Sequence, residues 1–68
     1  MNNKQKQEKL FRNPIDSLIA FRYPVGKSRL PLFRGKLKGK GEGPNGRFIK
    51  VLIGTLGVRT FLLHKIIL

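Results

Sequence analysis

The chain has 68 residues, enough for at most one small domain with a limited core. Fifteen lysines and arginines oppose three acids, and the resulting charge of +12 favours compaction against a polyanion. The chain has no cysteine and one histidine, so disulfides and thiolate metal sites are excluded. We therefore expect no enzyme, with no catalytic residue, metal, cofactor or small-molecule substrate.

The N-terminal part is polar and basic over residues 1–12. This composition predicts a flexible basic arm, either a solvated tail or a segment that orders on RNA or DNA. Residues 13–68 are predicted to form a single small domain, with RNA as the expected partner because the chain is strongly basic. A short helix is predicted over 14–22, because Asn13 can cap it and Pro14 suits its first position.

A strand is predicted over residues 30–38, with Phe33 and Leu37 on one side. The other side would be basic and would carry Arg34, Lys36 and Lys38. Tyr23 and Phe33 could each stack on an RNA base or anchor the hydrophobic core.

A glycine-rich stretch follows, in which Gly41, Gly43 and Gly46 have the spacing G-x-G-x-x-G. After it, apolar residues at helical spacing predict a helix over 47–56. Aliphatic and β-branched residues predict a final strand over 58–67. The fold class expected from this order is α/β, with a small β-α-β unit.

Four interpretations of the glycine stretch compete. A plain turn needs no ligand, whereas a dinucleotide site would need an acid about 20 residues later, and no acid follows Glu42. A nucleotide-triphosphate loop would need Lys and then Ser or Thr, where this chain has Arg47 and Phe48. The fourth is a turn whose backbone amides and following helix start contact an RNA phosphate. The charge and the basic strand favour this last interpretation.

The segments Lys40-Gly41-x-Gly43-Pro44-x-Gly46-Arg47, Gly57-Val58-Arg59-Thr60 and Lys65-Ile66 carry a resemblance. Over residues 40–67 the chain resembles the C-terminal half of the family of the universal small-subunit ribosomal protein eleven. The resemblance implies a strand, a turn on the rRNA backbone, a helix and a second strand. The turn of this chain is one residue longer, around Asn45, and the first 39 residues do not show the family's earlier strands.

The sequence thus favours a structural RNA-binding protein, a ribosomal component with rRNA and neighbouring ribosomal proteins as partners. Its place would be the ribosome, in the cytoplasm or in a mitochondrion or plastid. The predicted RNA-binding residues are Lys27, Arg29, Arg34, Lys36, Lys38, Lys40, Gly41, Gly43, Gly46 and Arg47.

Two other classes remain open. One is a cationic membrane-associated peptide, although no run of about 18 apolar residues predicts a membrane span. The other is a small phage or viral regulator that binds an acidic protein surface. Charge alone does not separate these classes from an RNA-binding protein.

Overall fold

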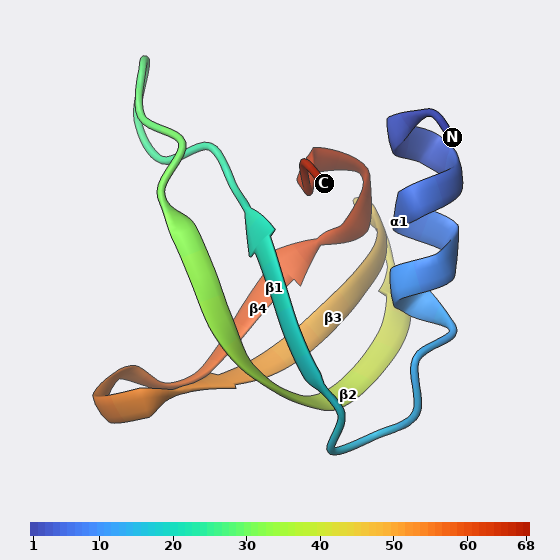
Figure 1. Cartoon of the computed structure of the whole chain (residues 1–68), viewed down its shortest axis with the longest axis vertical. Coiled ribbons are helices and arrows are strands. Elements are labelled where there is room, and N and C mark those ends of the chain that lie inside the picture. The colour runs from blue at the N-terminus through green and yellow to red at the C-terminus, as the bar shows by residue number, and fades with distance from the viewer.

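All 68 residues are described by a computed structural model, which is mostly β. A single α-helix precedes a four-stranded antiparallel sheet with the strand order β1-β2-β3-β4 (Figure 1). The elements are α1 (Asn3–Phe11), β1 (Leu18–Arg22), β2 (Leu32–Gly43), β3 (Gly46–Ile53), the 3-10 turn η1 (Gly54–Leu56), β4 (Gly57–Leu62) and the 3-10 turn η2 (Leu63–Lys65). No helix has the length and apolar character needed to cross a membrane.

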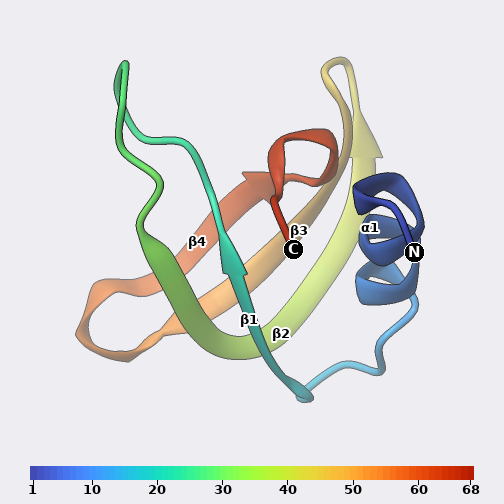
Figure 2. The same cartoon turned by 45° about the horizontal axis from the view of Figure 1, so that its top comes forward.

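Strand β2 is long and strongly curved, and it is shared between two partners (Figures 1 and 2). Its first part pairs with β1 and its later part with β3, and Lys36 is paired on both sides. At the neighbouring Gly35 a Cβ would lie only 2.1 Å from the carbonyl oxygen of Leu52 on β3. Because Gly35 has no side chain, β3 can pack closely against the bend of β2.

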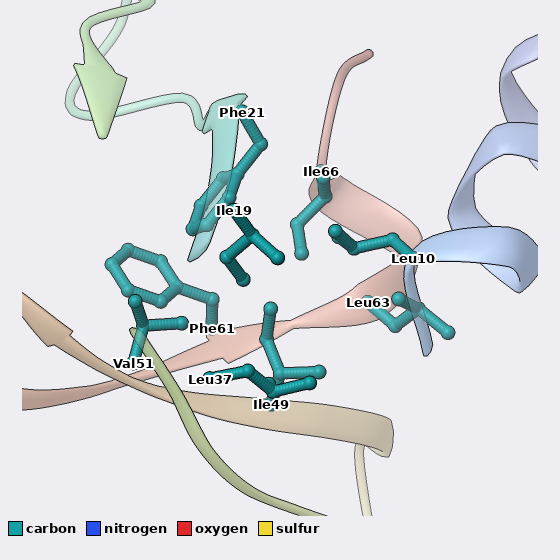
Figure 3. Close-up of a cluster of buried hydrophobic side chains, with 9 residues drawn as sticks. All are labelled: Leu10, Ile19, Phe21, Leu37, Ile49, Val51, Phe61, Leu63 and Ile66. Atoms are coloured by element: carbon teal, nitrogen blue, oxygen red, sulfur yellow. The ribbon is translucent and has the colours of Figure 1, made fainter. Parts of the chain in front are cut away.

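The chain end returns to the first strand and draws the sheet towards closure. After β4 and η2, Ile67 lies beside Arg22 of β1, and the two residues exchange backbone hydrogen bonds of 3.0 and 2.9 Å. The curved sheet thus wraps around a core of nine buried side chains (Figure 3), which are Leu10, Ile19, Phe21, Leu37, Ile49, Val51, Phe61, Leu63 and Ile66. The single bridge to Ile67 covers the outer edge of β1 at its last residue, Arg22.

Aromatic rings occupy one side of this core. The ring of Phe61 lies 4.9 Å from that of Phe21, 5.0 Å from Tyr23 and 5.1 Å from Phe33, measured between centroids. The hydroxyl of Tyr23 also accepts a hydrogen bond from the Leu62 amide. Tyr23 and Phe33 therefore pack against the core.

Helix α1 stands where the sequence predicted a flexible arm. Asn2 and Gln5 form a capping box at its start, and Leu10 enters the core. The Gln7 amide donates hydrogen bonds to the carbonyls of His64 and Ile66, and it is buried although polar. These contacts to the distant C-terminal segment, which no local pattern reveals, order the helix.

The predicted β-α-β unit is not present in the structure. Residues 14–22 contain strand β1 in place of a helix, and residues 47–56 contain β3 and η1. A short run of apolar residues satisfies both helix and strand periods, so pairing with neighbouring strands decides between them. The predicted strand over 30–38 corresponds to β2, which continues to Gly43, and the strand over 58–67 corresponds to β4 as far as Leu62.

Candidate nucleic-acid interface

A β-bulge in β2 decides which way each lysine of this strand points. The pairing with β3 runs from Leu37 opposite Val51 to Gly39 opposite Lys50, and so passes over Lys38. Residues directly opposite in antiparallel strands share a face of the sheet. Before the bulge the even-numbered residue Lys36 faces outward, whereas Lys40 lies opposite the fully buried Ile49 and faces α1. The extra residue thus reverses the alternation expected from sequence.

Lys40 is bound to the end of α1. Its Nζ donates hydrogen bonds to the carbonyl oxygens of Phe11 and Asn13, and lies 5.5 Å from the centre of the Phe11 ring. A cation is favourable at this position because the last carbonyls of a helix lack backbone partners and carry partial negative charge. Lys40 therefore holds the helix on the sheet.

Arg47 reaches the same helix from β3. Its guanidinium donates two hydrogen bonds to the carboxylate of Glu8 and lies 5.0 Å from the centre of the Phe11 ring. Glu42, directly opposite Arg47 in the sheet, adds a second negative charge on this side. The Lys38 Nζ is likewise 2.7 Å from the carboxylate of Asp16. Lys38 and Arg47 are thus paired with acids of this chain.

Acid should weaken the docking of α1. The hydrogen bonds from Arg47 hold the pKa of Glu8 below its ordinary value of 4.5, as Lys38 does for the pKa of Asp16. A carboxyl group with a lowered folded-state pKa adds stability above its unfolded pKa, and this is lost as pH falls through the folded value. We expect the unfolding free energy to fall as the pH drops below about 5, and less so in Glu8→Gln. Urea denaturation at several pH values measures this.

The matched control is Glu42→Gln, which removes the same charge from a side chain with no hydrogen bond to Arg47. It should keep the acid-dependent loss of stability that Glu8→Gln reduces. Equal pH profiles for the two variants would show that Glu8 contributes through net charge alone.

The glycines of the predicted phosphate turn have other roles in the structure. Gly46 has a φ of +109° and follows the two-residue connection Pro44-Asn45 between β2 and β3. A glycine at positive φ after such a turn is typical of hairpins. Because β3 follows instead of a helix, the expected helix start for a phosphate is missing. Gly41 and Gly43 lie inside β2 beside Phe48.

Three other cations share the outer face of the sheet: Arg34, Lys36 and Lys50, here called the outer strip. Arg34 and Lys36 alternate along β2, and Lys50 lies on β3 diagonally across from Lys36. None of the three forms a hydrogen bond or ion pair within the chain. Asp16 is close enough to feel the charge of Lys36, but its carboxylate is bonded to Lys38.

The two remaining predicted cations, Lys27 and Arg29, lie in the loop between β1 and β2. The loop carries a tight turn, with Gly26 at a φ of +70° and a backbone bond of 2.9 Å from the Val25 amide to the Arg29 carbonyl. Figure 1 shows this loop projecting beyond the sheet, and Figure 2 shows the β2–β3 turn at the opposite side of the molecule. Lys27 and Arg29 are therefore exposed but separate from the glycine-rich turn.

The sequence prediction omitted Lys50 from the candidate RNA-binding residues, because it fell inside the supposed helix. A signal was present in the alternation of residues 49–51: Ile49 and Val51 are fully buried and Lys50 between them is exposed. That alternation is typical of a strand with one face in the core.

A polar groove of about 420 Å³ lies between α1, the β2–β3 turn and η2. Its lining residues are Asn3, Lys4, Gln7, Glu8, Gly46, Arg47, Leu63 and His64. Two predicted site residues, Gly46 and Arg47, are therefore together here, but Arg47 is occupied by Glu8. The acid opposes anion binding in this groove, so the outer strip is the stronger candidate.

Comparison of the chain with protein-family models, with curated proteins and with solved structures found no match.

Proposed function

We propose that this chain is a structural RNA-binding protein that contacts the phosphate backbone through the outer strip. The observation that carries the proposal is a separation of charge across the sheet. Glu8 is bonded to Arg47 and Asp16 to Lys38, and Glu42 lies opposite Arg47. The outward-facing Arg34, Lys36 and Lys50 keep their charges available to a polyanion.

The mechanism is neutralisation of phosphates with release of counterions, which makes the affinity strongly dependent on salt and largely independent of sequence. Lys27 and Arg29 add charge on the projecting loop and extend the contact along the RNA. The inner cations Lys40 and Arg47 act indirectly, because they hold α1 on the sheet.

The ribosome is the first RNA assembly to test. A chain of 68 residues with a charge of +12 suits a protein that folds against rRNA between neighbouring proteins. The proposal does not depend on the resemblance described above, since the helix which that resemblance implies after the turn is strand β3 here.

A membrane surface is the competing partner, because the outer face also carries exposed apolar residues. Leu18 is 79% exposed and Val58 is 53% exposed. The discriminating experiment compares binding to a structured RNA and to vesicles of anionic phospholipid over a series of salt concentrations. RNA binding with a steep salt dependence is expected, and tighter binding to vesicles at about 0.15 M salt would overturn the proposal.

A second measurement addresses the setting in which the protein works. If the partner is rRNA, the protein should co-sediment with ribosomal subunits and dissociate in high salt. Binding to an acidic protein in preference to the subunits would instead support a regulator.

A further inference from the structure

We infer that a lane of three glycines on β2, together with the Phe48 ring, is a binding site for unpaired bases of single-stranded RNA. The inference rests on the proposed function and narrows it, because it names the kind of RNA that the outer face accepts. The lane consists of Gly39, Gly41 and Gly43, which alternate along β2 after the bulge.

The three glycines face outward. Gly39 lies opposite the exposed Lys50, and Gly41 lies opposite Phe48. The intervening residues Lys40 and Glu42 point the other way, towards α1. The outer surface of β2 beyond the bulge therefore carries no side chains of its own.

Interactions inside the chain do not account for glycine at two of these positions. None of the three has a positive φ, so the backbone does not require glycine. A Cβ on Gly39 would make an ordinary contact of 3.8 Å with Lys50, and one on Gly43 a contact of 3.7 Å with Phe48. Glycine inside a strand weakens it and often marks the close approach of a ligand or another backbone. Because no part of this chain covers Gly39 or Gly43 closely, an external ligand is the better explanation.

Phe48 borders the lane on β3. A Cβ on Gly41 would lie 2.8 Å from Cζ of the Phe48 ring, so the ring extends over this glycine. Its neighbour Ile49 is fully buried in the core, whereas Phe48 is half-buried and not part of the core cluster. The ring therefore presents an aromatic surface on the outer face, next to positions without side chains.

The chemistry of this surface fits single-stranded RNA. Bases stack on aromatic side chains, and phosphates need cations within reach of the stacked base. Lys50 follows Phe48 at the next outward position of β3. Lys36 lies on β2, diagonally across from Lys50. A base on Phe48 would thus have its flanking phosphates near the outer strip, with the RNA backbone passing over the uncovered Gly39 beside Lys50. A duplex, whose bases are already stacked on each other, gains nothing from the ring.

The test measures binding of a single-stranded RNA oligomer that contains a fluorescent adenine analogue, and of its duplex, to the full chain. Two variants alter the site without changing its charge. Phe48→Leu removes the aromatic surface, and Gly39→Val fills the lane with a residue that strands favour. We expect each to weaken single-strand binding about ten-fold or more, with an unchanged salt dependence and little effect on the duplex. Fluorescence quenching by the natural protein should disappear in Phe48→Leu.

Two controls separate stacking from altered folding. Phe48→Tyr keeps the ring and should bind as the natural chain does. Ala20→Val adds bulk at an outward position of β1 outside the lane and should also leave binding intact. Thermal unfolding of each variant shows whether it remains folded in the binding assay.

The outcomes distinguish this inference from the proposed function. Equal affinity for single strand and duplex would overturn the base-binding site, as would natural affinity in both Phe48→Leu and Gly39→Val. Either result would leave the proposed binding to the phosphate backbone intact. Absence of RNA binding by the natural chain would overturn both.

Discussion

Replacement of Arg34, Lys36 and Lys50 by alanine should lower the affinity for single-stranded RNA by about 50-fold at about 0.15 M salt. Each phosphate contact contributes about 0.7 to the slope of log affinity against log salt for a single strand. Loss of three contacts should therefore reduce the slope by about two, and extrapolation of this change from 1 M to 0.15 M salt yields the 50-fold factor. Fluorescence anisotropy over a salt series measures both quantities.

The matched control carries the substitutions Lys4→Ala, Lys6→Ala and Lys9→Ala on α1. It loses the same three charges, from exposed positions on another element. If the outer strip binds RNA, the control should lose much less affinity and keep most of the slope. Equal losses in the two triple variants would mean that RNA responds to total charge and recognises no particular face.

Gly35→Val should strongly destabilise the fold. The Cβ of any other residue would lie 2.1 Å from the carbonyl oxygen of Leu52 and 2.9 Å from a methyl group of Val51, which itself is fully buried. Relief of these contacts requires β3 to move away from β2 and so opens the core. Overpacking of a core typically costs 1–3 kcal/mol, and a clash with backbone should reach about 3 kcal/mol or more. That is a large share of the stability of a small domain, which is about 5 kcal/mol.

Gly39→Ala is the control for this substitution, because it changes the same residue type in the same strand where space exists. The added Cβ would be 3.8 Å from Lys50, and the unfolded chain would lose conformational freedom, so the variant should be as stable as the natural chain or slightly more. Urea denaturation followed by circular dichroism compares the two. A folded Gly35→Val with natural stability would contradict the tight packing of β3 against the bend.

Binding and stability use different cations in this protein. Lys38, Lys40 and Arg47 form contacts within the chain that hold the helix and the loop before β1, whereas the outer strip forms none. A total charge of +12 therefore overstates the charge that a partner meets at the glycine-rich turn. Substitutions in the inner set should alter folding first and RNA binding only as a consequence.

Part of the fold and of the interface could be predicted from sequence. The alternation of Phe33 and Leu37 with Arg34 and Lys36 correctly indicated a strand with a basic face, since a period of two is a direct consequence of strand geometry. Composition similarly determined the small size, the lack of disulfides and the excess of cations. These properties depend only on local geometry and on residue counts, and both can be read from the sequence without knowledge of long-range contacts.

Only the tertiary structure decided the rest. Residues 48–53 fit both a helix and a strand, and pairing with β2 and β4 selected the strand. The bulge at Lys38 reversed the direction of Lys40, and α1 provided Glu8, 39 residues away, as the partner of Arg47. Such long-range contacts choose among local conformations of similar free energy, and they determined which lysines and arginines remain available to RNA.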